Sequence, residues 1–128
     1  MRLVVSVLGL ALGLGVLVAP AAWADGDAKA GERVFNQCRA CHSLEPGRNM
    51  VGPSLAGVFG RKAGTAPGFN FSAAMRESGV VWDEKTLDQY LADPRRFMPG
   101  NKMAFIGLRV AQQRNDLIEY LEHAAKSR

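Results

Sequence analysis

Cysteine, histidine and net charge are all scarce in this sequence. Its 128 residues include two cysteines with two residues between them, which excludes a framework of disulfides spread along the chain. The 16 basic and 12 acidic residues leave an excess too small and too scattered to indicate nucleic-acid binding. No segment alternates apolar and polar residues clearly enough to predict a sheet, and beyond the first residues there is no repeat or low-complexity segment.

Residues 1–24 are typical of an export signal. Arg2 gives a short basic start, residues 3–18 are almost wholly apolar, and an Ala-Trp-Ala sequence ends at Ala24. The apolar run is short for a membrane span, which needs about 20 residues, so an uncleaved anchor is the less favoured alternative. We predict cleavage after Ala24 and a single domain over residues 25–128, with a net charge of 15 − 12 = +3 once Arg2 is lost.

Helical periodicity predicts an all-α domain with few helices and long loops. The expected helices cover 28–38, 72–77, 84–92 and 110–126, with Asp27 and Asp83 as N-caps. In the last helix Leu117, Ile118, Leu121 and Ala124 are expected to face inward, and Asp116, Glu119 and Glu122 mostly outward. Residues 43–70 are rich in Gly and Pro, and loops this long in a compact domain imply a large buried ligand.

The strongest chemical signal is the segment Cys38-Arg39-Ala40-Cys41-His42. Two thiols at this spacing can add to the two vinyl groups of a haem, and the adjacent histidine then reaches the iron. A thioredoxin-like redox pair is disfavoured because the pair ends a helix and no strand-rich scaffold is visible. A zinc site with His123 is disfavoured because neighbouring Cys41 and His42 are poor partners on one tetrahedral ion.

The sixth ligand of such an iron would decide the function, and methionine is the residue to consider. Met50 lies in the loop after the motif, Met75 on the short predicted helix, and Met98 and Met103 in one later loop. The turn at 99–102 favours Met103 by position, with Met98 as its main rival, although a methionine is often only core filler.

The sequence as a whole resembles the class I cytochromes c, the family of mitochondrial cytochrome c and its exported bacterial counterparts. The motifs that carry the resemblance are Cys38-x-x-Cys41-His42, Gly52-Pro53-x-Leu55, Pro67-Gly68-Phe69, Trp82, Tyr90-Leu91 and Pro99-Gly100-x-Lys102-Met103-x-Phe105. They occur in this order, and the likeness runs from Gly31 and Phe35 to Tyr120 and Leu121.

The resemblance implies one covalent haem c and a fold in which the first and last helices pack crosswise, Gly31 and Phe35 against Leu117 and Tyr120. It implies Cys38 and Cys41 as attachment sites and His42 and Met103 as axial ligands, with the Pro53 carbonyl accepting the free ring N–H of His42. Arg61 and Trp82 would lie near a buried propionate, and Tyr90 and Asn101 would form hydrogen bonds near the Met103 sulfur. Other expected pocket residues are Leu55, Phe69, Leu91 and Phe105.

Two residues depart from the mitochondrial pattern. Phe71 and Met75 stand where those proteins commonly have Tyr and Asn. A more apolar haem floor disfavours the extra positive charge of ferric iron, so we expect a somewhat higher reduction potential.

The resemblance implies a monomeric, periplasmic carrier of single electrons. It suggests a bc1-type complex as donor and an oxidase, reaction centre or reductase as acceptor, with a dehydrogenase as a further possible donor, docked through Arg39, Arg95, Arg96 and Lys102. A haem enzyme or a sensor domain is the alternative. The enzyme would need an open or labile sixth site, and no distal histidine or arginine is evident for it; a sensor would usually carry an output module.

Overall fold

The computed structural model describes residues 25–126, and these form five helices joined by long loops. The helices are α1 (Ala28–Phe35), α2 (Ala73–Glu77), α3 (Glu84–Ala92), α4 (Pro94–Phe97) and α5 (Ala111–Ala124). No strand occurs in this part of the chain, where Lys62 and Val81 form one isolated bridge. No helix within it is long and apolar enough to cross a membrane. The predicted signal peptide, residues 1–24, lies outside the described residues.

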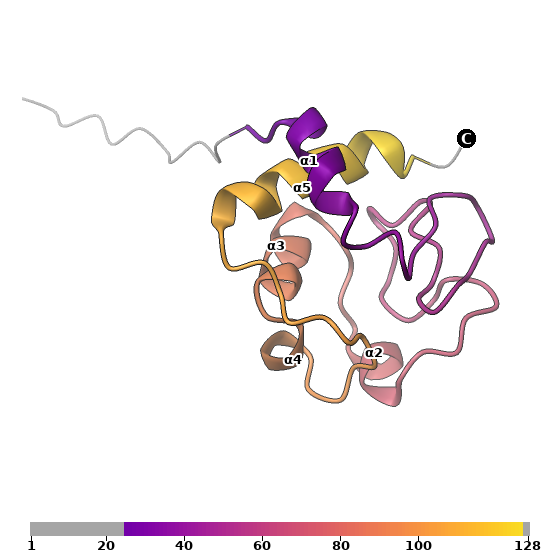
Figure 1. The fold of residues 1–128 in the computed structure, drawn as a ribbon. Coiled ribbons are helices and arrows are strands. Elements are labelled where there is room, and N and C mark those ends of the chain that lie inside the picture. The colour runs from indigo at the N-terminus through magenta and orange to yellow at the C-terminus, as the bar shows by residue number, and fades with distance from the viewer. Residues whose placement is uncertain (1–24, 127–128) are drawn as a thin grey trace, which may run out of the picture.

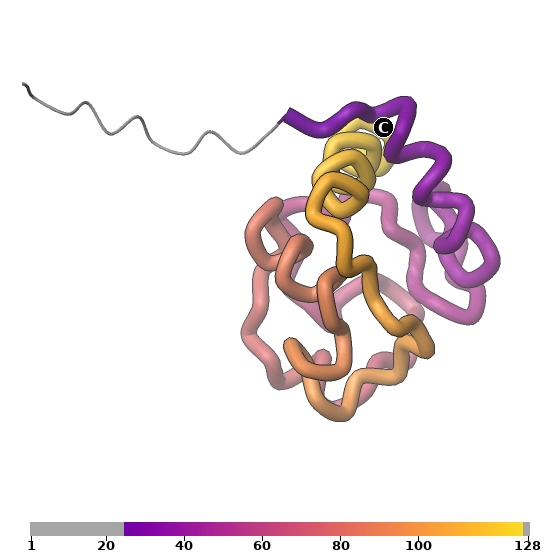
Figure 2. The backbone as a smooth tube through the Cα atoms, turned by 60° about the vertical axis from the view of Figure 1, so that its left-hand side comes forward, coloured from indigo at the N-terminus to yellow at the C-terminus, as the bar shows by residue number. Residues whose placement is uncertain are grey.

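The first and last helices cross at the top of the molecule and hold its two ends together. Figures 1 and 2 show α1 lying across α5, which confirms the crosswise packing implied by the resemblance. At the crossing, buried Gly31 meets the backbone carbonyl of Asp116 and the side chain of Tyr120. The Phe35 and Tyr120 rings lie 5.4 Å apart, and Phe35 and Leu117 are almost completely buried. A side chain at Gly31 would prevent this close approach.

Helix α1 is shorter than the sequence predicts. The Asp27 carboxylate caps it by accepting hydrogen bonds from the backbone N–H groups of Lys29 and Ala30. The helix ends at Phe35 rather than near Cys38, because the following amides bond three residues back, as in Cys38 N–H to Phe35 O at 2.8 Å. The two cysteines therefore lie on tightened turns beyond the helix.

Helix α4 is missing from the sequence-based prediction. Asp93 and Pro94 end α3 as expected, but the same two residues begin α4, with Pro94 in its first turn and Asp93 as its N-cap. The Asp93 side chain accepts a hydrogen bond from the Arg96 N–H at 3.1 Å. Helix α3 agrees with the prediction, with Asp83 as N-cap and Leu87, Tyr90 and Leu91 buried.

Helix α5 differs from the prediction in which side chains face inward. It covers Ala111–Ala124 instead of 110–126, and Ala125 is buried while Ala124 is only half-buried. Asp116 was expected to face mostly outward and is buried. Its carboxylate accepts hydrogen bonds from the Asp27 backbone N–H at 2.8 Å and from the Gln112 amide at 2.9 Å, which compensates for burying the charge.

Candidate functional site

A cavity of about 260 Å³ opens beneath the crossed helices, between the long loops and α3. Figure 1 shows the loop segments on the right, α3 and α4 on the left, and α2 at the lower end. Most of the predicted site residues line the cavity, although they come from sequence positions as far apart as Cys38 and Phe105. These residues are Cys38, Cys41, His42, Pro53, Leu55, Arg61, Phe69, Trp82, Tyr90, Lys102, Met103 and Phe105.

The His42 ring is fixed by a backbone carbonyl and a glycine. Its Nδ1 lies 2.8 Å from Pro53 O, so Nδ1 carries the proton as donor and Nε2 is left with its lone pair. A Cβ on Gly52 would lie 2.8–2.9 Å from the ring nitrogens, so only glycine leaves room for the ring there. Burial lowers the pKa of His42 below its ordinary value of 6.5, and the bond to Pro53 opposes that shift.

Both cysteine side chains are half-buried on the same wall, and they are not joined in a disulfide. The backbone turns back on itself between them, with the Cys41 and His42 N–H groups bonded to Cys38 O at 3.0 and 2.9 Å. Burial, and secondarily the neighbouring Cys41, raises the pKa of the Cys38 thiol from 9.0 to about 11. The turn therefore presents two thiols and the His42 imidazole to one cavity.

Met103 also lies on the cavity wall, and polar groups hold it there. Asn101 Oδ1 accepts a hydrogen bond from the Met103 backbone N–H at 2.9 Å, and the Tyr90 hydroxyl lies 3.8 Å from the Met103 sulfur. Burial raises the pKa of Tyr90 to about 12, so its hydroxyl stays a donor at neutral pH. Met98, the rival by position, is 4% exposed in the core and does not line the cavity.

Two predicted pocket residues lie behind the wall instead of on it. Leu91 is buried in the core, where its carbonyl accepts a hydrogen bond from the Leu108 N–H at 2.7 Å. Asn101 supports Met103 from behind, because its amide nitrogen donates to Pro94 O and Met98 O at 2.9 and 2.8 Å. Its bond goes to the Met103 backbone rather than to the sulfur.

Arg61 and Trp82, expected near a buried propionate, both line the cavity. Arg61 donates to the carbonyls of Ala56 and Ser54 at 2.9 and 3.1 Å, and burial lowers the pKa of its guanidinium below the ordinary value. Trp82 is 6% exposed, with its ring 5.0 Å from that of Tyr90. Phe71 and Met75, the departures from the mitochondrial pattern, also line the cavity.

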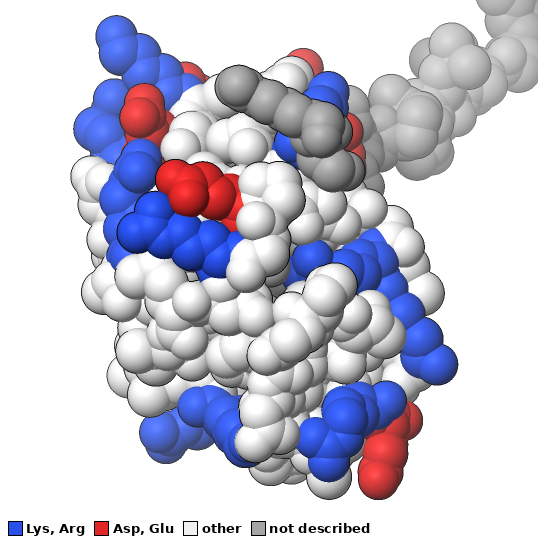
Figure 3. Space-filling view, turned by 90° about the vertical axis from the view of Figure 1, so that its right-hand side faces the viewer, with Lys and Arg blue, Asp and Glu red and all other residues white. Residues whose placement is uncertain are grey.

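The four predicted docking cations have different surroundings. Arg39 is held at the α1–α5 crossing by Glu32 at 3.6 Å, by the Tyr120 hydroxyl at 3.4 Å and over the Phe35 ring. Lys102 reaches the cavity wall and donates to Asn70 O at 3.2 Å, and Arg95 and Arg96 are exposed on α4. Figure 3 shows Lys and Arg at opposite ends of one face, with a broad uncharged band between them.

The structure offers no support for the two alternative readings of the cysteine motif. Within residues 25–126, no group of three or more His, Cys, Asp or Glu side chains could hold a metal ion. His123 is exposed and pairs with Glu119 at 2.9 Å. A redox pair at the start of a helix is equally absent there, because Cys38 and Cys41 follow α1.

The sequence did not predict several cavity-lining residues, among them Gln37, Val51, Val58 and Ser72, or two side chains that support the site without lining it. Asn49 links the loop after the cysteine motif to Pro67, and Ser54 is almost completely buried beside Pro53. Both bond to backbone atoms of loops. The only sequence signal for such roles is the general tendency of Asn and Ser to bond nearby backbone.

Comparisons with known proteins agree with this arrangement. The family model for cytochrome c matches residues 28–125. The chain belongs to the cytochrome c family. It is 57% identical over 96 residues to cytochrome c2 iso-2 of Magnetospirillum molischianum, covering 75% of this chain and 96% of that protein. It is 47% identical to cytochrome c2 of Rhodomicrobium vannielii, covering 86% and 89% of the two chains.

The solved structure of cytochrome cH from Methylobacterium extorquens is similar in fold as well. Its TM-score is 0.74 at 48% identity, and the match covers 77% of this chain and 99% of that one. The predicted all-α class I cytochrome c fold is thus confirmed. Proteins of this family are electron carriers with one covalently bound haem c. The residues present fit this group, because one mostly apolar cavity gathers two thiols, an imidazole with a free Nε2 and a thioether.

Proposed function

We propose that this cytochrome c is an exported, single-electron carrier whose haem is attached at Cys38 and Cys41 and ligated by His42 and Met103. The observation that carries the proposal is that these four side chains, from two segments far apart in the sequence, line a single cavity. When bound, the haem supplies an iron that changes by one electron between its ferrous and ferric states.

The cysteines fix the cofactor without needing an oxidant. Cys38 and Cys41 would hold the haem through two C–S bonds, each made by adding one S–H across a vinyl double bond, so that no oxidant is needed and no group leaves. Because Cys38 and Cys41 lie on one turn, both additions are directed to the same edge of the cavity. The same turn leads into His42, so attachment and axial ligation come from one short segment.

The axial pair sets the preference between oxidation states. The bond from His42 Nδ1–H to Pro53 O orients the ring and makes Nε2 a better electron donor. The Met103 thioether favours the ferrous state, and Tyr90 and Asn101 hold it in position. If His42 and Met103 both bind the iron, they would leave no coordination position for substrate or oxygen, which supports electron transfer over catalysis.

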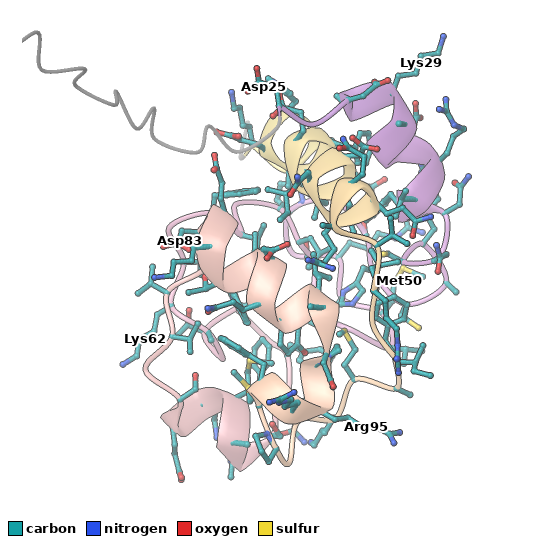
Figure 4. All side chains as sticks on the ribbon, turned by 90° about the vertical axis from the view of Figure 1, so that its left-hand side faces the viewer. Asp25, Lys29, Met50, Lys62, Asp83 and Arg95 are labelled. Carbon is teal, nitrogen blue, oxygen red and sulfur yellow. The ribbon has the colours of Figure 1, made fainter. Side chains whose placement is uncertain are left out.

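Electron transfer partners are proposed to be membrane redox complexes. A bc1-type complex would be the donor, and an oxidase, reaction centre or reductase the acceptor. Figure 4 shows Arg95 on the same side of the molecule as Met50 of the loop after the cysteine motif, away from Lys62 and Asp83. Arg95, Arg96 and Lys102 would steer an acidic surface toward this side, and Arg39 contributes less because it is already paired. The carrier is proposed to act as a monomer, and its association with partners should weaken as salt rises.

The location follows from the leader sequence. We propose removal of residues 1–24 and release of a domain beginning at Asp25 into the periplasm. The mass of the protein purified from the periplasmic fraction tests this proposal. A mass that retains residues 1–24, with the protein in the membrane fraction, would indicate an uncleaved anchor instead.

The absorption spectrum of the purified protein, oxidised and reduced at neutral pH, tests the ligation. Sharp low-spin bands on reduction and a weak long-wavelength sulfur-to-iron band on oxidation are expected. High-spin features, or a shift on adding carbon monoxide, would mean an open sixth site. The enzyme and sensor alternatives would then be favoured.

A further inference from the structure

We propose that Asn49 is a positioning residue for His42, acting through the peptide group that joins Pro53 and Ser54. The inference rests on the proposed ligation by His42. The Asn49 Oδ1 accepts a hydrogen bond from the Ser54 backbone N–H at 2.9 Å. Its Nδ2 donates to Pro67 O at 2.9 Å, on a different loop.

One rigid peptide group carries both the contact with His42 and the contact with Asn49. The carbonyl of Pro53 and the N–H of Ser54 belong to the same planar peptide. His42 Nδ1–H binds the oxygen of this peptide at 2.8 Å, and Asn49 binds its N–H. Because the plane is rigid, fixing the N–H with Asn49 also fixes the direction in which the carbonyl faces His42.

No other contact among the described residues fixes the orientation of this peptide group. Pro53 has no N–H of its own to anchor the segment. The Ser54 hydroxyl donates to Glu45 O at 2.6 Å, and Ser54 O accepts from Arg61 at 3.1 Å, but these bonds hold other atoms of Ser54. They can keep the loop folded without fixing the tilt of the preceding peptide plane.

The bond between Asn49 and Ser54 N–H also has an electronic effect. When Asn49 Oδ1 accepts the hydrogen bond from Ser54 N–H, it polarises the peptide group that joins Pro53 and Ser54. Hydrogen bonds linked in series through one peptide group strengthen one another. The Pro53 oxygen thereby becomes a stronger acceptor for the His42 proton. A stronger bond there makes the imidazole a better donor and favours ferric iron. Loss of Asn49 should therefore shift the equilibrium toward the ferrous protein.

Both ends of the Asn49 carboxamide are needed for the complete link. Its acceptor oxygen serves the peptide before Ser54, and its donor nitrogen ties that loop to Pro67, two residues before Phe69 on the cavity wall. An aspartate keeps the acceptor but not the donor. A leucine keeps the branched shape and neither function. These two variants separate the two bonds.

The experiment compares holo-protein variants Asn49→Leu and Asn49→Asp with the unchanged protein, with Gln113→Ala on exposed α5 surface as control. Three quantities are measured: the exchange rate of the His42 Nδ1 proton in the ferrous state by NMR, the midpoint potential, and stability in urea. In Asn49→Leu we expect exchange about fivefold to tenfold faster, as for one lost hydrogen bond. We also expect a shift of about twofold to fivefold toward the ferrous protein at fixed ambient potential.

Asn49→Asp should keep the slow exchange of the His42 proton, because the bond to Ser54 N–H survives. Asn49→Leu with unchanged exchange and potential would overturn the proposal, even if its stability falls, since that pattern means a purely structural role. If Asn49→Leu does not fold, fast exchange in Asn49→Asp overturns it instead. Failure of the proposed ligation is distinguishable, because the unchanged protein would then lack the low-spin spectrum.

Discussion

Replacing Gly31 with alanine should loosen the crossing on which the whole fold depends. A Cβ at this position would overlap the Asp116 carbonyl oxygen and lie 2.5 Å from its carbon and 2.7 Å from the Tyr120 Cβ. Ordinary carbon contacts begin near 3.4 Å. Two of these obstacles are backbone atoms of α5, so rotating a side chain cannot relieve them, and α1 and α5 must move apart.

The size of the effect follows from two opposing contributions. Overpacking of a tight site costs about 1–3 kcal/mol, and the backbone obstacles place this case at the upper end. Alanine is better than glycine in a helix by about 0.5–1 kcal/mol, which offsets part of the loss. The net expectation is a loss of about 2 kcal/mol, equivalent to a fall in Tm on the order of 10 °C for a domain of this size.

Thermal and urea unfolding of the holo-protein measure this loss, with Lys29→Ala on the exposed face of the same helix as the matched control. The control should stay within about 0.5 kcal/mol of the unchanged protein. A Gly31→Ala protein as stable as this control would refute the reasoning, because it would mean that the two helices can separate without cost.

Two further predictions concern the cavity floor and the acid limit of stability. Phe71→Tyr combined with Met75→Asn should lower the midpoint potential, because the two substitutions restore polar groups near the ferric charge. The control variant Phe59→Tyr, which lies outside the cavity, should leave the potential unchanged. A rise in potential in the double variant would refute the expectation. Hydrogen bonds from Thr86 lower the pKa of Asp83 below 3.8, so its stabilisation is complete above pH 3.8 and is lost as pH falls through the lower folded value. Asp83→Asn should therefore flatten the acid limb of a urea-stability profile, and an unchanged limb would contradict the assignment.

Periodicity was sufficient to predict the elements that are held by apolar stripes and caps. The capped starts at Asp27 and Asp83 and the buried residues of α3 match the structure. The prediction of the helices is wrong where the same residue pattern is compatible with two local structures. An Asp-Pro pair can end one helix and begin another, and the sequence analysis considered only the first. Asp116 is buried because its carboxylate accepts hydrogen bonds from the Asp27 N–H and from Gln112. The bond from Asp27 is a tertiary contact, and the helical periodicity of one segment does not predict such contacts.

Most residues that line the site could be predicted from the sequence because they belong to recognisable motifs. The residues that hold those side chains in position could not be predicted in this way. The sequence places Met103 after a turn, yet nothing in it says that Asn101 bonds the Met103 backbone rather than its sulfur. Likewise, Gly52 and Pro53 are visible in a motif, while Asn49 and Ser54 are isolated polar residues in a loop. Their partners are backbone atoms, which leave no signature in residue type or spacing.

This difference between ligands and supports has a physical basis in the loops. Residues 43–70 have no helix or strand in the described structure, so no ladder of backbone hydrogen bonds fixes their carbonyls. Side chains do this work instead: Asn49, Ser54 and Arg61 each bond loop backbone near Pro53, and Asn101 does the same beside Met103. An electron carrier gains from ligands that stay in place when the iron changes charge. The side-chain-to-backbone bonds behind the cavity wall are therefore where sequence changes should tune this protein without altering its ligands.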